Sequence, residues 1–361
     1  MNAVKLEDIA KKLGLSTSTV SRALSGNGRV GEKTRHRVLE AVRESDYTVN
    51  AVARSLRLRD AKNIGIVVPD ITNSFFSSVI KGAQDACRQH GYTLMVCNSD
   101  ESEEFEEESL RTLLEKQVSG LILATVSARP EGVVPYRRLS IPVVFIDNIP
   151  EGAEALDVVS IDNHRAASRI TKEMVARGYR DVGMIAGPKS QSTGLLRYTG
   201  FLEALRAEGI SPREEWVLAG DFKMESGRAL MRKLLKLPER PRAMVISNNY
   251  MAYGAINAIR DAGLDIPGDI AIASFDAMDS TGLITPLIAS INQPAEEIGL
   301  RAAEIIVARL SGDSRESGTE VILEPTLSPG DSACYNSVVE HVVRASGGQP
   351  AAIYAVVFMP I

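Results

Sequence analysis

The first 58 residues constrain the fold most strongly, because their apolar residues recur at helical spacing on either side of one glycine. A first helix is predicted with an apolar face made of Leu6, Ile9, Ala10 and Leu13. Gly14 then allows a tight turn, since glycine adopts a positive φ without steric cost. The pattern therefore predicts a helix, a tight turn and a second helix.

A second and a third helix are predicted after this turn. Ser16 can cap the second helix through its side-chain oxygen, and the third helix is predicted over Glu32–Ser45. The inward-facing side chains of these two helices are predicted to be Val20, Ala23, Leu24, Val38, Leu39 and Val42. The opposite face of the second helix carries short hydroxyls and one guanidinium, at Thr17, Ser18, Thr19 and Arg22. Such a face suits a helix that reads bases in the major groove, although on these residues alone an ordinary solvated face is an equal alternative.

This segment resembles the headpiece of lactose-repressor-type (LacI/GalR family) transcription regulators, and the resemblance continues to about Thr326. Its sharpest part is the stretch Asn50–Leu56, which reads NAVARSL. The resemblance implies a DNA-binding head over residues 1–49 and a hinge over residues 50–61 that becomes helical only on operator DNA. Two hinges of a homodimer would enter the minor groove, with Leu56 as the apolar wedge. The DNA contacts implied are Ser16, Thr17, Ser18, Thr19, Arg22, Asn27, Asn50, Ala53, Leu56 and Arg57.

The charge distribution agrees with DNA binding at one end only. The formal net charge is −5, yet residues 1–60 hold 12 basic and 7 acidic side chains, whereas the remainder holds 29 basic and 39 acidic ones. The basic end can approach phosphates while the acidic remainder is repelled from them. The three cysteines, Cys87, Cys97 and Cys334, lack CxxC spacing, and no apolar run or leader suggests a membrane span or export. We expect a cytoplasmic protein without a metal or cofactor.

After residue 62 the pattern changes to alternating strands and helices. Buried strands are predicted at 64–68, 93–97, 120–124, 143–146, 182–186, 243–247 and 270–274. Helices are predicted at 74–90, 104–117, 197–208, 226–237, 251–262 and 294–310. Two strand–turn–helix segments, beginning at Asn63 and Asp181, look like a loose internal repeat. The fold class predicted is α/β, with two doubly wound lobes like those of type I periplasmic binding proteins.

The resemblance implies chain crossovers between the lobes near Val159–Asp162 and Ser290–Gln293. The core would span residues 62–331, with a first lobe of 62–161 and 293–322 and a second lobe of 162–292 and 323–331. Residues 332–361 form a tail whose order the sequence does not define. An appended strand and a loose tail are both open, and the stretch SVVEHVVRA at residues 337–345 is too short for the sustained heptads of a tetramerising coiled coil.

An effector site is predicted in the cleft that the strand ends face. Residues that match the family's sugar or purine contacts are Phe75, Phe76, Asp147, Arg197, Phe222, Asn248, Asp276 and Gln293. Aromatic rings can stack on a sugar, and the polar side chains can bond hydroxyls or a carboxylate. Taken singly, phenylalanines such as Phe75 and Phe76 are more often core residues, and Asp276 is equally consistent with a turn or a helix cap.

Two acidic features bear on this site. Relatives commonly carry Asn-Asp where this chain has Asn248-Asn249. The loss of a carboxylate near the cleft makes a sugar acid more plausible as the ligand. An alternative neutral hydrogen bond at this position explains the difference equally well. The run from Asp100 to Glu108 has seven carboxylates in nine residues. Such a run is typical of a solvated helix start, where negative charge stabilises the helix N-terminus.

The sequence therefore predicts a repressor that binds a pseudo-palindromic DNA operator as a homodimer under control of a small molecule. The effector classes considered are a sugar, a sugar acid and, as a lesser candidate, a purine. The alternative is a cytoplasmic sugar-binding protein or an enzyme built on the same two-lobed core. No GxxxxGK[ST], HExxH or GxSxG motif supports an enzyme. The identity of the effector, and whether it induces or co-represses, are not encoded in these patterns.

Overall fold

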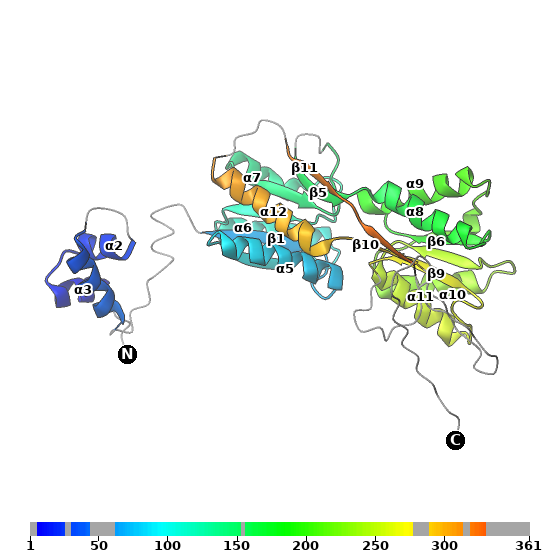
Figure 1. Cartoon of the computed structure of the whole chain (residues 1–361), viewed down its shortest axis with the longest axis horizontal. Coiled ribbons are helices and arrows are strands. Elements are labelled where there is room, and N and C mark those ends of the chain that lie inside the picture. Colours follow the sequence, from blue (N-terminus) through cyan, green and yellow to red (C-terminus); the bar gives the residue numbers. More distant parts are fainter. Residues whose placement is uncertain are drawn as a thin grey trace, which may run out of the picture. The chain divides into compact units, whose positions relative to one another are not determined.

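The computed structural model describes residues 6–25, 30–43, 62–152, 156–276, 289–312 and 318–329. The helical N-terminal residues form one compact unit and the residues from Ile64 onward form most of a second (Figure 1). The hinge predicted over residues 50–61 and the tail over residues 332–361 lie outside the described residues. In those that are described, no helix is both long enough and apolar enough to cross a membrane.

The N-terminal unit contains three helices, α1 (Leu6–Leu13), α2 (Thr17–Ser25) and α3 (Glu32–Arg43). Gly14 adopts φ +66°, as the predicted tight turn requires, and the Ser16 side chain accepts a hydrogen bond from Thr19 N at 3.2 Å. The core of this unit consists of Ile9, Ala10, Val20, Ala23, Val38 and Ala41. The prediction for Leu39 was wrong, because that side chain is 41% exposed, and Ala41 occupies the buried position instead.

The second unit is built on two six-stranded sheets. The first sheet has the order β11-β5-β4-β3-β1-β2, and the strands are β1 (Asn63–Val68), β2 (Thr93–Asn98), β3 (Gly120–Leu123), β4 (Val143–Ile146), β5 (Asp157–Ile161) and β11 (Glu320–Leu323). Its helices are α5 (Ser74–Gln89), α6 (Glu103–Glu115), α7 (Val134–Arg138) and α12 (Ala295–Leu310), with a 3₁₀ turn η1 (Glu131–Val133). The pairings of β1 with β3, β3 with β4, β4 with β5 and β5 with β11 are parallel.

The second sheet repeats this arrangement in the order β12-β10-β9-β8-β6-β7. Its strands are β6 (Val182–Ala186), β7 (Val217–Ala219), β8 (Ala243–Ile246), β9 (Ala271–Phe275), β10 (Ala289–Asn292) and β12 (Thr326–Pro329). Its helices are α8 (Asn163–Ala176), α9 (Ser192–Ala207), α10 (Met224–Leu235) and α11 (Asn249–Asp261), with a 3₁₀ turn η3 (Glu214–Trp216). Only the pairing of β12 with β10 is antiparallel among the registers described.

The chain crosses between the two sheets three times. It leaves the first sheet after β5 and enters α8, returns from β10 to α12, and crosses again between β11 and β12 (Figure 1). α12 packs against α5 at glycine contacts, since a Cβ on Gly299 would lie 1.9 Å from Val79 O and one on Gly82 1.9 Å from Glu296 O. This close approach fixes α12 on the first sheet, although α12 follows the elements of the second sheet in the sequence.

Candidate functional site

The N-terminal half of α2 presents hydroxyl groups on an exposed surface. Ser16 Oγ lies 2.9 Å from Ser18 Oγ and 2.8 Å from Thr19 Oγ1. Thr17, Ser18 and Arg22 are exposed, Thr19 is half-buried, and Val20 and Ala23 on the opposite side are buried. The helix also has no acidic residue in its first turn, so its positive N-terminal end is left uncompensated. Asn27, Asn50, Ala53, Leu56 and Arg57 lie outside the described residues.

All eight predicted effector residues line one cavity in the second unit. Phe75, Phe76 and Asp147 come from the first-sheet side, and Arg197, Phe222, Asn248, Asp276 and Gln293 complete the cavity. Further lining residues that the sequence did not single out are Pro69, Asn73, Glu101, Thr125, Asn148, Gln191, Thr193 and Asn249. The cavity has a volume of about 40 Å³. We call these sixteen residues the cleft.

Four cleft residues adopt a strained backbone after a strand ends, and one of them is Glu101, three residues after β2, with φ 56°. Asp147 follows β4 with φ 59°, Asp276 follows β9 with φ 53°, and Phe222 lies three residues after β7 with φ 66°. This left-handed region is costly for residues other than glycine and is found at functional sites, where surrounding contacts hold it. This backbone conformation accompanies the placement of three carboxylates and one aromatic ring at the cavity.

Arg197 is the only guanidinium in the cleft and is 3% exposed. Its Nε donates to Asn163 Oδ1 at 2.8 Å, and its Nη1 donates to the Ser247 carbonyl at 2.6 Å. The guanidinium carbon lies 4.1 Å from the centroid of the Phe275 ring. The Arg197 side chain is therefore held in place by contacts with α8 and with residues of the second sheet, and it also lines the cavity.

The carboxylates of the cleft are under-compensated. Asp147 Oδ1 lies 3.9 Å from Arg197 Nη2, too far for a hydrogen bond, and has no hydrogen-bond partner among the described residues. Burial raises the pKa of Asp147 to about 6, with Arg197 acting in the opposite direction. Burial also raises the pKa of Glu101 to about 7 and raises the pKa of Asp276. Desolvation thus outweighs Arg197 at Asp147 and Asp276, and it outweighs Gln191 and Lys223 at Glu101.

The remaining polar groups leave acceptors available in the same place. Asp276 accepts from Gln293 N at 2.9 Å and from Gln293 Nε2 at 2.7 Å. Gln293 Oε1 is buried and has no partner in the described part of the chain. Together with Asp147 Oδ1, it is an acceptor that a ligand hydroxyl could satisfy, because buried polar atoms are rarely left unbonded.

The aromatic residues serve both the core and the cleft. Phe75 is 7% exposed and Phe76 is 6% exposed, their ring centroids are 4.9 Å apart in an edge-to-face arrangement, and both belong to the core of the first sheet. Phe75 and Phe76 also line the cavity, as Phe222 does. They therefore provide an apolar wall for a ligand and close the end of the core.

Hydrogen bonds join the two sides of the cleft directly. Asn73 Nδ2 donates to Asn249 Oδ1 at 3.0 Å, and Asn249 Nδ2 donates to Asn73 Oδ1 at 2.8 Å. Thr72 Oγ1 lies 2.9 Å from the Tyr250 hydroxyl. Since α5 begins after Asn73 and α11 begins at Asn249, this amide pair links the N-terminal ends of two helices from different sheets.

A second set of bonds closes the other side of the cleft. Asn148 Oδ1 accepts from Ser192 N at 2.6 Å and from Ser192 Oγ at 2.7 Å. Gln191 Nε2 donates to Glu101 at 3.4 Å, and Lys223 Nζ donates to Asp100 O at 3.1 Å. The described structure is accordingly a closed arrangement, with little free volume and with bonds on both sides.

The interpretation of the run from Asp100 to Glu108 as a solvated helix start was wrong for two of its members. Glu103 and Glu104 are exposed in the first turn of α6, as expected. Glu101, however, lines the cleft, and Glu106 is 2% exposed and accepts from Thr125 Oγ1 at 2.7 Å and Val126 N at 2.6 Å. In the residues that the structure covers, no group of three or more His, Cys, Asp or Glu side chains could hold a metal ion.

Comparison with known proteins identifies the two parts of the chain separately. Residues 5–50 match the family described as "Bacterial regulatory proteins, lacI family". Residues 61–329 match the family described as "Periplasmic binding proteins and sugar binding domain of LacI family". The two matched families follow one another in the predicted order, with the DNA-binding head before the effector-binding core.

Individual proteins resemble this one along most of its length. The HTH-type transcriptional repressor PurR of Edwardsiella ictaluri is 34% identical over 89% of this chain and 94% of its own length. The ribose operon repressor of Escherichia coli is 31% identical over 85% of this chain and 93% of its own length. The solved structure of the transcriptional regulator CelR in complex with cellobiose has 27% identity and a TM-score of 0.68, covering 91% of this chain and all of that one. The chain therefore belongs to the LacI family of bacterial regulatory proteins, and it is a ligand-responsive, DNA-binding transcriptional repressor with a type I periplasmic-binding-protein-like core, not an enzyme.

Proposed function

We propose that this repressor binds a pseudo-palindromic operator as a homodimer and is controlled by a neutral sugar that occupies the cleft. The observation that carries the proposal is the convergence of all eight predicted effector residues in one cavity, supplied by elements of both sheets. Two of the similar proteins are named for ribose or bound to cellobiose, which supports a sugar as the ligand class.

The charge balance of the cleft favours a neutral ligand over a sugar acid. Glu101, Asp147 and Asp276 face a single guanidinium, that of Arg197, so a further carboxylate would meet net negative charge. The unbonded acceptors Asp147 Oδ1 and Gln293 Oε1 match hydroxyl donors instead. Although Asn249 removes a carboxylate, its amide is used in the pair with Asn73, which corresponds to the neutral hydrogen bond considered above.

For DNA binding, we assign the reading of bases to α2 and the contact with phosphates to basic residues of the predicted hinge, such as Arg57. Arg22 can form bidentate hydrogen bonds with guanine, while Ser16, Thr17, Ser18 and Thr19 can bond bases or phosphate oxygens. Asn27, Asn50, Ala53, Leu56 and Arg57 are assigned to the minor groove and its rims, by resemblance to the family. Such a regulator would act in the cytoplasm, where bacterial operators are.

The proposed homodimer is supported by the free edge of the first sheet. β2 is the last strand of that sheet, and its residues are half-buried or exposed throughout. Val96 is 44% exposed, Phe105 on the adjacent α6 is 47% exposed, and Ile71, whose N donates to Asn98 at the end of β2, is 46% exposed. An apolar strand edge of this kind is usually covered, and a second copy of the chain would cover it.

The regulatory step we propose is a change in closure. The ligand would bond groups from both lobes, divided as predicted near residues 161 and 292, and so alter the free-energy difference between open and closed forms. A sugar is larger than the 40 Å³ left in the closed cleft, so entry requires the amide pair or the Asn148–Ser192 bonds to open. A ligand that favours the closed form and a ligand that favours the open form would both change the relative position of the lobes. That change would then be transmitted to the hinges.

The deciding experiment is a thermal-shift screen of the full chain, followed by calorimetry with a matched pair of ligands. D-ribose and cellobiose would be screened, and D-glucose would be compared with D-glucuronate, which keeps the ring and its hydroxyls and replaces only the C6 hydroxymethyl group by a carboxylate. We expect stabilisation by neutral sugars only. Stronger stabilisation by the acid would contradict the charge argument, and stabilisation only by purines would contradict the sugar class.

A second experiment tests the DNA assignment. Arg22→Ala should relax base preference at one symmetric pair of operator positions and cost about 1–3 kcal/mol per half-site. Arg57→Ala should instead weaken binding to all sequences and flatten its salt dependence. Equal loss of specificity from the two substitutions, measured by binding to operator variants, would refute this division.

A further inference from the structure

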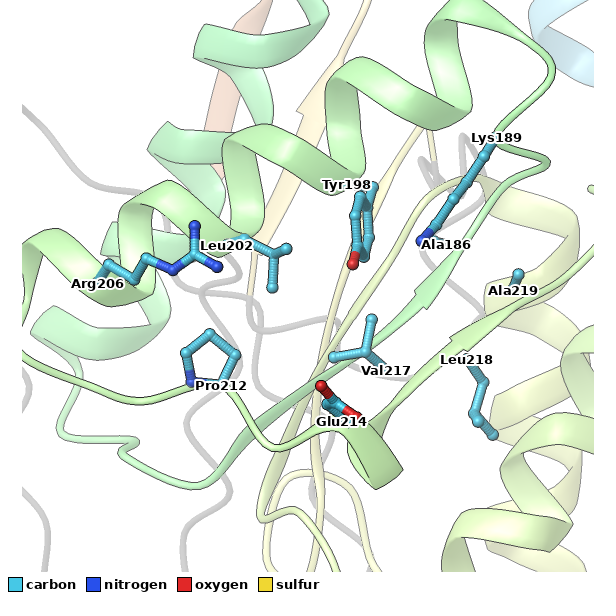
Figure 2. A pocket seen from close by; sticks show the side chains of 10 residues that line it. All are labelled: Ala186, Lys189, Tyr198, Leu202, Arg206, Pro212, Glu214, Val217, Leu218 and Ala219. Atoms are coloured by element: carbon cyan, nitrogen blue, oxygen red, sulfur yellow. The ribbon is translucent and has the colours of Figure 1, made fainter.

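A second cavity lies away from the cleft, between α9 and the edge strand β7 (Figure 2). Its volume is about 340 Å³, and it shares no lining residue with the cleft. Cavities of a few hundred Å³ are typical of small-molecule sites. The function proposed above makes no use of this one.

One wall of this cavity is a continuous stripe on α9. Tyr198, Leu202 and Arg206 are four residues apart, so their side chains follow one face of the helix. Val217 and Leu218 of β7 form the facing wall, and Figure 2 shows Tyr198 and Leu202 directed toward Val217. Since β7 has three residues and ends the second sheet, no further described strand covers these apolar groups.

The walls are apolar but incompletely buried. Tyr198, Leu202 and Val217 pack against the core between α8, α9 and the sheet, and Leu218 packs against the core on the other side of the sheet. Each of the four side chains is only partly buried. The cavity therefore curves around the strand edge and offers an apolar surface that a ligand could cover.

Charged groups stand around this apolar surface. Lys189 Nζ lies 3.8 Å from the centroid of the Tyr198 ring, Arg206 lies on the other side of that ring, and Glu214 lies below it (Figure 2). None of these three charges has an ion-pair partner in the described residues. Two cations and one carboxylate leave one net positive charge at the rim.

We propose that this cavity is a second ligand site, for a small organic anion with an apolar body. The body would cover Leu202, Val217 and Tyr198, and the anionic group would bond Arg206 or Lys189. A neutral polyol, suited to the acceptor-rich cleft, would leave the net positive charge of this rim unpaired and the apolar walls uncovered. The two sites thus differ in ligand chemistry.

The two sites are also connected through shared elements. Tyr198 directly follows Arg197 of the cleft, and Ala186 O, at the end of β6, accepts from Gly220 N at 2.8 Å just beyond β7. The ring of Phe222 packs on Gly187, where a Cβ would lie 2.1 Å from that ring. A ligand that shifts the ends of β6 and β7 would therefore move Phe222, so occupancy of one site should change affinity at the other.

Trp216 provides a direct reporter of occupancy. It is the only tryptophan of the chain, is 4% exposed, and immediately precedes Val217. The full-length protein would be titrated with cyclohexanecarboxylate, with cyclohexylmethanol and with cyclohexylmethylammonium, which share a ring but differ in charge. We expect a saturable change of tryptophan fluorescence with the carboxylate alone. Equal responses to all three, or a response that never saturates, would overturn the proposal.

A charge-reversal variant separates this site from general surface attraction. Arg206→Glu should weaken carboxylate binding by about tenfold or more and should allow saturable binding of the ammonium compound. Arg260→Glu, on an exposed arginine of α11 in the same half of the molecule, is the matched control and should change neither. Equal effects of the two variants would refute the site. Unchanged affinity of the cleft for D-ribose at saturating carboxylate would refute the connection between the sites.

Discussion

At the scale of single residues, the balance between Asp147 and Arg197 should be visible in the pH dependence of stability. The pKa of Asp147 is raised from 3.8 to about 6 in the folded protein, so the folded state holds its proton to higher pH than the unfolded state does. The free energy of unfolding should therefore fall as pH rises from about 4 to about 6 and then level off. Glu101, with its pKa raised to about 7, extends this fall by about one pH unit.

The prediction is tested with Asp147→Asn, which removes the titrating group and keeps its shape. The stability advantage of the variant over the native protein should be larger at pH about 7.5 than at pH about 4.5, by about 2 kcal/mol. Chemical denaturation at both pH values measures this. Loss of stability at the higher pH would show that the ionised carboxylate is stabilised by Arg197 despite the 3.9 Å separation.

A second prediction at this scale concerns Arg197 itself. Because its guanidinium bonds Asn163 and the Ser247 carbonyl and is 3% exposed, Arg197→Ala should cost about 3–5 kcal/mol of stability as well as abolishing the response to sugar. Denaturation and calorimetry on the same preparation separate the two effects. Gln293→Ala is the gentler comparison, expected to weaken sugar binding with a smaller loss of stability, and an intact sugar response in both variants would refute the placement of the effector site.

The sequence allowed prediction of the cleft residues that follow strands. It did not allow prediction of the cleft residues that bond to segments distant in the sequence. Asp147, Asp276 and Phe222 were predictable because they directly follow apolar runs or match the family's contacts. Asn73, Asn148 and Gln191 were not, because their roles depend on which distant segments lie opposite. Glu101 was not predicted either, because it lies in a run with six other carboxylates and nothing in the sequence distinguishes it from them. Only the structure shows that Glu101 has φ 56° and lines the cleft.

At the scale of elements, the amide pair between α5 and α11 should control closure. Asn249→Asp keeps an acceptor for Asn73 Nδ2 but replaces the donor to Asn73 Oδ1 by an oxygen, which places two acceptors together. We expect a more open molecule without ligand, measurable as an increased radius of gyration in solution scattering. Thr72→Val removes two exposed bonds of the Thr72 hydroxyl, one to Tyr250 across the cleft and one to Asp70, and is the control that should have little effect. An unchanged radius in Asn249→Asp would show that the pair does not hold the cleft closed.

Elements with continuous apolar runs were predicted closely, and short or polar ones were not. The strands predicted at 64–68, 143–146 and 182–186 agree with β1, β4 and β6 to within one residue. β7 has only three residues, and β5 contains Asp157 and Ser160, so neither has a strong apolar pattern. α9 begins at Ser192, five residues before the predicted start, because Ser192, Thr193 and Gly194 are weak helix formers that tertiary packing places in the helix.

At the scale of the whole molecule, the proposed homodimer should depend on the edge of β2. Val96→Lys should shift the protein toward monomers in sedimentation experiments and weaken operator binding, because a buried, unpaired ammonium would oppose pairing of two copies. Leu139→Lys is the matched control, since Leu139 is 64% exposed on the same half of the molecule but lies away from β2, next to α7. A stable dimer in Val96→Lys would place the interface elsewhere.

The threefold passage of the chain between the sheets has a consequence for how the molecule can come apart. Neither half is a continuous stretch of sequence, so a protease that cuts the Glu324–Pro325 connection between β11 and β12 leaves two other covalent links in place. Nicked protein should therefore migrate as one particle under native conditions and retain its stoichiometry. Once denatured and separated, the smaller fragment would carry only β12 of the second sheet, while the larger one would keep the other described strands of both sheets, so this cleavage yields no autonomous half.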